Sequence, residues 1–248
     1  MRNLIIFSAF GLLIASCSTG FLKKQDSISE PKEVLTTNPS GKGNTITISF
    51  KKGGSFYYPL IAVWLENPDS SYIQTLYVSK SLATGVFKYG RSEKNHWVPA
   101  SRRAPQALPY WSHKRGVIAD DGLYVPDQKT AVPDAYSGAT PTTGFVLNTH
   151  SDSPLHGIVR ILLELNQNWD WNEFWTNDKY PGDEYYKYSC QPAVVYEAIV
   201  NIDSATRYYL MHPIGHSHYS GKNGLLYKDL GSLTTALHIA DSIVVAIK

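Results

Sequence analysis

Residues 58–79 read YPLIAVWLENPDSSYIQTLYVS, and this stretch decides the fold class. Ile61, Val63 and Leu65 are apolar at every second position, which is the period of a strand with one buried face. The sequence Asn67–Ser70 that follows has the residue types of a tight turn, and a second strand-like segment rich in aromatic and branched residues comes after it. We therefore predict a β-hairpin.

Working outward from the hairpin, several other segments have a strand-like pattern. They are Thr45–Phe50, Gly157–Leu165, Ala193–Ile202, Arg207–Met211 and at least one strand within Leu233–Ile247. Residues 84–130 are rich in Pro, Arg and Trp, and we expect a short helix there that packs across the sheet. Short strands without alternating helices predict an all-β fold, mainly an antiparallel β-sandwich with one or two short helices.

The N-terminus has the features of an export signal. Arg2 supplies a positive charge, and the apolar stretch Leu4–Ala15 is shorter than the about 20 residues that a membrane-spanning helix needs. The sequence Ile14-Ala15-Ser16-Cys17 that ends it resembles the lipobox of bacterial lipoproteins. We interpret residues 1–16 as a lipoprotein signal peptide and Cys17 as the lipidated residue. The alternative is an ordinary signal peptide with a Cys near its end.

The rest of the chain divides into a linker and a domain. Residues 17–44 are polar and lack apolar periodicity, so we expect a flexible tether, and we expect residues 45–248 to form a single β-sandwich domain. Acyl chains on Cys17 would hold the protein on a membrane, facing the periplasm. By resemblance to lipoproteins of Gram-negative bacteria, Ser18 does not signal retention in the inner membrane, which favours the outer membrane.

Composition excludes some partners and one kind of cross-link. The formal net charge is only +2, so the chain lacks the basic excess that nucleic-acid binding requires. Lipidation of Cys17 would leave Cys190 as the single other cysteine, which rules out an internal disulfide. Cys190 is then either a small buried apolar group or a free thiol.

The segment Asp134-Ala135-Tyr136-Ser137-Gly138-Ala139-Thr140 contains the pattern Asp-x-x-Ser-Gly-Ala-Thr. This pattern resembles the acceptor motif of bacterial proteins in which an exported FAD:protein FMN transferase joins FMN to the Thr hydroxyl. Gly138 and Ala139 have little or no side chain, so a nucleotide and an enzyme can approach Thr140. Asp134 would orient the loop or accept the hydroxyl proton, and Ser137 would bond the backbone of the turn.

An alternative interpretation of this segment is purely structural. Asp, Ser and Gly are common turn residues, and the flanking Pro133 and Pro141 keep the segment out of a helix or a central strand in either case. The basic residues Arg102, Arg103 and Arg115 would meet either a flavin phosphate or solvent.

The segment His212–Gly224 holds three His residues within seven positions. On a strand, His216 and His218 would point to the same face, and imidazole is a common ligand of transition metals. The spacing matches no metal motif, so these two residues are weak candidates and we assign no metal site. A polar hairpin tip is the main interpretation, and side chains that line a ligand pocket are a further alternative.

Residues 169–188 are rich in Trp and Tyr. They would cover one end of the sandwich or stack on a flavin ring or a sugar. Asp120-Asp121-Gly122 has the residues of a turn rather than of a catalytic pair. Motifs of serine hydrolases, haem proteins, zinc peptidases and phosphate-binding loops are absent from the sequence.

Taken in order, several segments resemble the predicted periplasmic proteins grouped as domain of unknown function 2271. The matching segments are Val63–Glu66, Tyr72–Leu76, Pro133–Thr140, Leu163–Asn166, Gln191–Glu197, Gly215–Gly224 and Leu233–Leu237. The resemblance implies export, a β-rich fold and an association with FMN transferases and flavin-linked membrane redox proteins.

Three hypotheses follow. The first is an electron-transfer component that carries FMN covalently on Thr140 and is more a redox carrier than an enzyme by itself. The second is a non-catalytic lipoprotein that binds or scaffolds a partner. The third is a periplasmic protein that binds a metal through His216 and His218.

Overall fold

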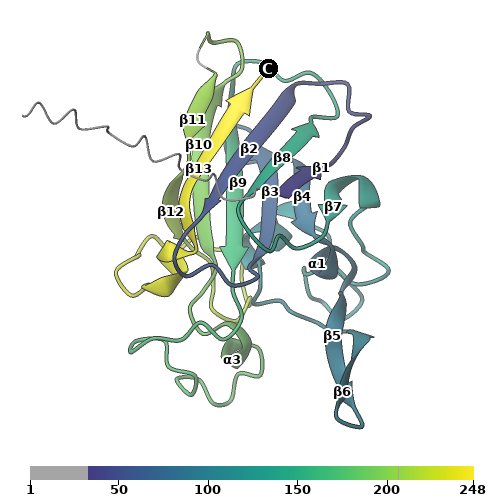
Figure 1. Ribbon diagram of the computed structural model, residues 1–248, viewed down its shortest axis with the longest axis vertical. Helices are drawn as coiled ribbons and strands as arrows, with labels where there is room; N and C mark the ends of the chain where they lie inside the picture. Colours follow the sequence, from purple (N-terminus) through teal and green to yellow (C-terminus); the bar gives the residue numbers. More distant parts are fainter. Residues whose placement is uncertain (1–32, 206) are drawn as a thin grey trace, which may run out of the picture. The chain divides into compact units, whose positions relative to one another are not determined.

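The computed structural model describes residues 33–205 and 207–248, and these residues form an all-β, sandwich-like fold (Figure 1). The strands are β1 Glu33–Thr36, β2 Thr45–Lys52, β3 Leu60–Glu66, β4 Tyr72–Ser79, β5 Val86–Glu93, β6 His96–Ser101, β7 Ser137–Gly138, β8 Phe145–His150, β9 Ile158–Asn166, β10 Val194–Asn201, β11 Tyr208–Leu210, β12 His212–His216 and β13 Ala240–Ile247. The helices are α1 Lys80–Thr84, α2 Pro109–Arg115, α3 Tyr186–Ser189 and the 3₁₀ turns η1 Asp134–Tyr136 and η2 Thr235–His238. The predicted fold class is confirmed.

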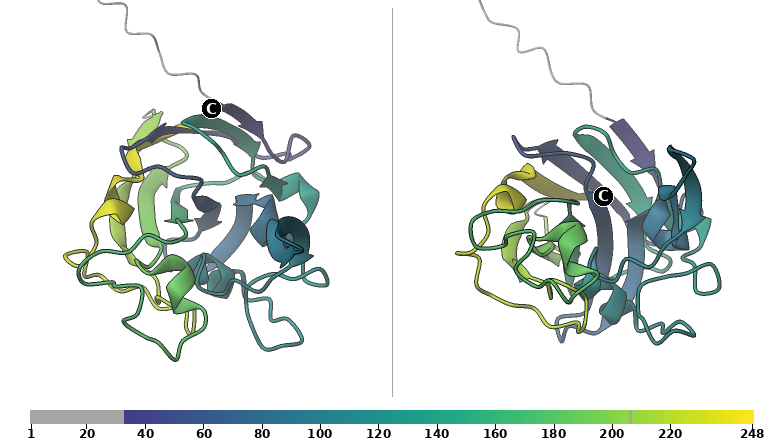
Figure 2. Two further views of the ribbon diagram at one scale, coloured as in Figure 1. Left: turned by 60° about the horizontal axis from the view of Figure 1, so that its bottom comes forward. Right: turned by 90° about the horizontal axis from the view of Figure 1, so that it is seen from below.

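Two sheets face each other across the main core (Figure 2). The first has the strand order β1-β8-β2-β13-β11, and the second has the order β12-β10-β9-β3-β4-β7. The predicted alternation is present in β2, where Ile46, Ile48 and Phe50 are fully buried between the sheets. The predicted hairpin is also confirmed, because β3 and β4 pair antiparallel.

Part of the second sheet, including all of β3, is buried on both faces, which the hairpin pattern alone did not predict. Ile61, Val63 and Leu65 of β3 point into the main core, whereas Ala62 and Trp64 point to a second apolar cluster on the outer face. Residues between 80 and 132, including α1 and α2, cover that outer face. The expected short helix across the sheet is therefore present as α2, and the β5–β6 hairpin projects away from the two sheets (Figure 1).

The N-terminal boundary of the domain differs from the prediction. Glu33–Thr36 form β1, which pairs in parallel with β8, and Asn38 donates its backbone N–H to the carbonyl of Ala135 at 2.7 Å. The part of the expected tether from residue 33 onward is thus built into the first sheet. A four-residue strand whose partner lies more than a hundred residues away leaves no periodic signal in the sequence.

Two other features of the N-terminal prediction lie outside the described residues. The signal peptide 1–16 and the lipidation site Cys17 belong to the stretch before residue 33, so both stay predictions. Among the described residues, no helix is long and apolar enough to cross a membrane.

Candidate functional site

The motif Asp134–Thr140 lies at the edge of the second sheet, on the loop between the outer layer and β8. Asp134–Tyr136 form the 3₁₀ turn η1, and Ser137–Gly138 form β7, which pairs in parallel with Val78 and Ser79 at the end of β4. A two-residue edge strand flanked by Pro133 and Pro141 agrees with the expectation that proline keeps this segment out of a central strand.

Three contacts hold this loop in place. The Tyr77 hydroxyl donates to the Ala139 carbonyl at 2.7 Å, and the Tyr136 N–H donates to the Pro133 carbonyl at 3.0 Å. On the far side of Thr140, the Glu33 carboxylate accepts the Thr142 N–H at 2.8 Å and also the Thr142 hydroxyl. These contacts fix the backbone on both sides of Thr140.

Thr140 itself is partly exposed, and Ala139 before it is exposed. Within residues 33–205 and 207–248, the Thr140 hydroxyl makes no hydrogen bond. Gly138 has a steric role, because a Cβ at this position would lie 3.0 Å from Cε2 of Tyr77. The motif therefore presents the Thr140 hydroxyl to other molecules. Its backbone at Gly138 lies close against Tyr77 of the neighbouring strand β4.

The two polar side chains of the motif differ from the roles expected for them. The Asp134 carboxylate faces solvent and pairs with Lys80 at 3.4 Å. The turn is shaped instead by the backbone carbonyl of Asp134, which accepts the Ser137 N–H. The Ser137 hydroxyl is buried, and among the described residues it has no hydrogen-bond partner. Ser137 therefore does not bond the turn backbone, because its side chain points inward at the sheet edge.

A cavity of about 180 Å³ lies on the other side of the same loop. Tyr136 of the motif and Pro133 before it form one wall, and Tyr72, Gln74 and Arg115 line the rest. Tyr72 and Gln74 lie in Tyr72–Leu76, one of the segments of the family resemblance, but nothing in the sequence marked them as site residues. Only the fold brings them beside the Thr140 loop.

Two side chains that line this cavity each carry a buried hydrogen-bond donor that has no acceptor among the described residues. The donor atoms are Nε2 of Gln74 and Nη1 of Arg115. Burial also lowers the pKa of Arg115. A buried donor without an acceptor costs about 1–3 kcal/mol, so such atoms mark places where a ligand oxygen is expected. Donors of this kind suit a ligand that carries acceptor oxygens.

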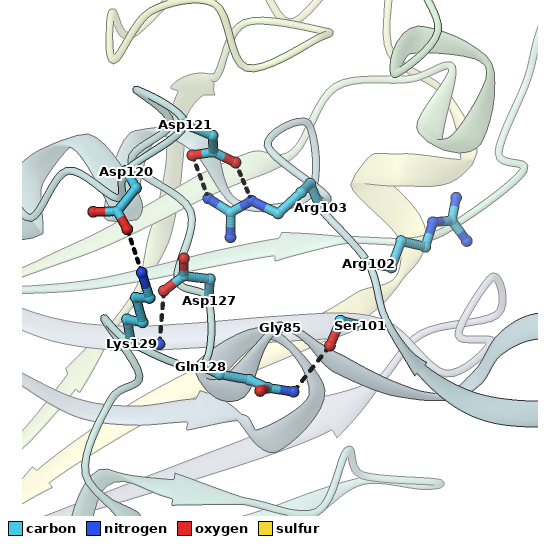
Figure 3. A pocket seen from close by; sticks show the side chains of 9 residues that line it. All are labelled: Gly85, Ser101, Arg102, Arg103, Asp120, Asp121, Asp127, Gln128 and Lys129. Atoms are coloured by element: carbon cyan, nitrogen blue, oxygen red, sulfur yellow. Dashed lines mark hydrogen bonds and ion pairs between the residues drawn. The ribbon is translucent and has the colours of Figure 1, made fainter.

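A second cavity, of about 370 Å³, has a different character (Figure 3). Arg103 forms a two-pronged pair with Asp121, whose pKa is lowered by that contact, and Lys129 pairs with Asp120 at 2.6 Å. The Arg102 side chain points away from this group and lies over the ring of Tyr188 at 3.9 Å. Two ion pairs, Arg103 with Asp121 and Lys129 with Asp120, thus span this cavity, which makes it a structural network.

The His segment turns back on itself as its turn residues predicted, since His216 and Tyr227 form an antiparallel bridge, but it is not an exposed polar tip. His216 and Ser217 are buried, and His216 lies at the end of β12 and stacks on Tyr227 with 5.4 Å between ring centroids. Burial lowers the pKa of both His216 and His218, which keeps the rings neutral. In the part of the chain that the structure describes, no group of three His, Cys, Asp or Glu side chains could hold a metal.

The aromatic segment 169–188 divides into two parts. Trp175 and Tyr186 are buried in the main core, with Tyr180 stacked on Tyr219 at 4.2 Å, so this part closes one end of the sandwich. Trp169, Trp171 and Phe174 remain 55% exposed. Cys190 is fully buried, and burial raises the pKa of its thiol to about 11, as expected of a small apolar group.

Comparison of the chain with models of protein families, with curated proteins and with solved structures gave no match.

Proposed function

We propose that this chain is a periplasm-facing lipoprotein, related to domain of unknown function 2271, that carries FMN covalently on Thr140 and transfers electrons. The observation that carries the proposal is the placement of the seven-residue motif. Its threonine hydroxyl is accessible and makes no hydrogen bond within the described residues, while contacts from Tyr77 and Glu33 fix the backbone around it.

The modification is a phosphoryl transfer. The Thr140 oxygen attacks the FMN phosphorus of FAD, the bond between the two phosphates breaks, and AMP leaves while the hydroxyl proton passes to a base. Positioning dominates such reactions, so a fixed loop with small residues at 138 and 139 suits an acceptor that must enter another enzyme's active site. The bound flavin supplies the redox chemistry, and the protein binds and orients it.

Acyl chains on Cys17 would hold this electron carrier at the membrane. A tethered domain meets membrane redox proteins at a raised effective concentration. Export would come first and modification second, because the transferase itself acts outside the cytoplasm.

Mass spectrometry of the whole exported protein tests the proposal. We expect the chain co-expressed with an FAD:protein FMN transferase to gain the mass of FMN less one water. Thr140→Ala abolishes the gain, Thr140→Ser retains part of it, and Thr143→Ala, a neighbouring threonine outside the motif, leaves it unchanged. A wild-type chain that stays unmodified beside an active transferase contradicts the proposal.

Partner binding is a second proposal, favoured by the exposed rings of Trp169, Trp171 and Phe174. It predicts that a periplasmic or membrane partner binds at least tenfold more weakly when Trp169 and Trp171 are replaced by Ala, since buried aromatic anchors dominate interfaces. Thr140→Ala leaves this binding intact. Pull-down and titration with the two variants separate the proposals, and equal affinity of the double variant and the wild type rules this one out.

A further inference from the structure

The cavity beside the Thr140 loop shares a residue with the motif itself. Tyr136 lines the cavity and precedes Thr140 by four positions, so the two residues lie at most about 14 Å apart along the chain. A ribityl chain and a phosphate separate the hydroxyl that holds FMN from the flavin ring. The ring therefore comes to rest some distance from Thr140, and this cavity lies next to the loop that holds it.

The polar groups of the cavity are arranged for a ligand with acceptor oxygens. Gln74 is 8% exposed, and its Oε1 accepts the Asp152 N–H at 2.8 Å, which orients Nε2. Arg115 donates through Nη2 to the Thr130 carbonyl, which orients Nη1. The hydrogen bonds of Oε1 and Nη2 thus fix the orientation of the two side chains. Their other nitrogen atoms, Nε2 and Nη1, have no partner among residues 33–205 and 207–248.

The remaining walls are aromatic and acidic. The rings of Tyr72 and Tyr136 line the cavity, and tyrosine rings stack well on flat heteroaromatic ligands. The Asp152 carboxylate at the rim accepts the Tyr136 hydroxyl at 2.7 Å, and that bond raises the pKa of Tyr136 to about 12. Asp152 also accepts from Asn38 at 2.8 Å, so the acid is held in place at the mouth of the cavity.

We propose that this cavity holds the pyrimidine edge of the flavin ring, whose two carbonyl oxygens accept hydrogen bonds from Nε2 of Gln74 and Nη1 of Arg115. The edge also carries an N–H between the two carbonyls, which suits the nearby carboxylate of Asp152. The inference rests on the proposed attachment of FMN to Thr140. It goes beyond that attachment because it assigns the residues that position the ring and set its potential.

A guanidinium beside this edge has a predictable effect on the redox chemistry. Reduction places negative charge on the pyrimidine side of the ring, and a positive charge nearby stabilises it. Arg115 therefore raises the midpoint potential of the bound flavin. Tyr72 and Tyr136 stacked on the ring quench its fluorescence.

The test uses the flavinylated full chain, and intact mass first establishes that each variant is loaded. We expect Arg115→Gln to lower the midpoint potential and Gln74→Met to raise the flavin fluorescence. Arg102→Gln is the matched control, because this arginine lies in the larger cavity over Tyr188. Loaded variants with the potential and fluorescence of the wild type overturn the inference, as does a shift in Arg102→Gln alone.

A second measurement does not depend on covalent attachment. Free riboflavin is titrated into Thr140→Ala protein with and without the change Gln74→Met or Arg115→Gln, after circular dichroism has shown that each variant is folded. Loss of either donor is expected to weaken binding about tenfold, the effect of one hydrogen bond from a charged or well-oriented donor. Equal binding by all three proteins refutes the cavity assignment. An unmodified wild type together with donor-dependent riboflavin binding refutes only the attachment to Thr140.

Discussion

Trp111→Ala is expected to lower the free energy of unfolding by about 3–5 kcal/mol. Trp111 is fully buried in the second apolar cluster, where α2 packs on the outer face of the second sheet. Its indole N–H donates to the Thr75 hydroxyl at 3.0 Å. Truncation leaves a large cavity and removes one of the two hydrogen-bond partners of the Thr75 hydroxyl, which keeps its bond to the Tyr72 hydroxyl.

Urea unfolding followed by circular dichroism measures this effect. Trp97→Ala is the matched control, since Trp97 on the projecting β5–β6 hairpin is 63% exposed and its truncation should change stability by less than about 0.5 kcal/mol. A loss below about 1 kcal/mol for Trp111→Ala would show that the outer layer is not a packed part of the domain.

The second large effect is a dependence of stability on pH that originates from Glu164. This residue of β9 is fully buried, and its two carboxyl oxygens accept the backbone N–H groups of Tyr110 at 3.2 Å and of Trp111 at 2.7 Å. Helix α2 has no side-chain cap of its own, so Glu164 caps it from the neighbouring sheet. Burial raises the pKa of Glu164 to about 8, although the two N–H donors act in the opposite direction.

The direction in which stability changes with pH follows from the pKa of Glu164 in the folded and in the unfolded chain. The unfolded chain releases the Glu164 proton near pH 4.5, whereas the folded chain holds it until about pH 8. The contribution of Glu164 to stability is therefore fully present below pH 4.5 and is lost as the pH rises to about 8. The loss amounts to at most about 1.4 kcal/mol per pH unit across that window.

Unfolding measured at pH 5, 6.5 and 8.5 checks this prediction. Glu164→Gln has no ionisable group at this position, so its stability should fall less steeply than that of the wild type between pH 5 and 8.5. At pH 5 the variant should be less stable by about 1–3 kcal/mol, because an amide supplies one acceptor for two N–H donors. Glu173→Gln, an exposed glutamate, serves as control, and parallel pH profiles for wild type and Glu164→Gln would refute the assignment.

Strands with a strong local pattern were predictable from the sequence, and strands defined by distant partners were not. β2 begins where the alternation of its side chains begins, and β4 begins where the run of aromatic and branched residues follows the predicted turn. β8, with the sequence FVLNTH, alternates apolar residues with partly exposed Val146, Asn148 and His150, and its six residues gave too weak a signal. β1 is a strand only because β8 lies beside it.

The candidate site shows the same division. Thr140 is a candidate that sequence alone can propose, because its seven-residue motif lies in one continuous segment. The residues around it come from three other places in the chain: Tyr77 from β4, Glu33 from β1 and Arg115 from α2. No local pattern links these positions, since the fold alone brings them together. For the His segment, the turn residues indicated the turn that His216 and Tyr227 close, but composition did not show that His216 and Ser217 are buried.

The junction between β1 and the Thr140 loop has a mechanical consequence. The chain enters the domain at Glu33, whose N–H donates to the Gly144 carbonyl at 3.0 Å and whose carboxylate holds Thr142. A force that pulls on the chain ahead of Glu33 thus reaches the segment 140–144 before it reaches either core, and β1 is an edge strand that can peel away while β2 and β8 stay paired. A pull on the chain ahead of Glu33 would therefore loosen the segment that carries Thr140 first and leave the two sheets intact.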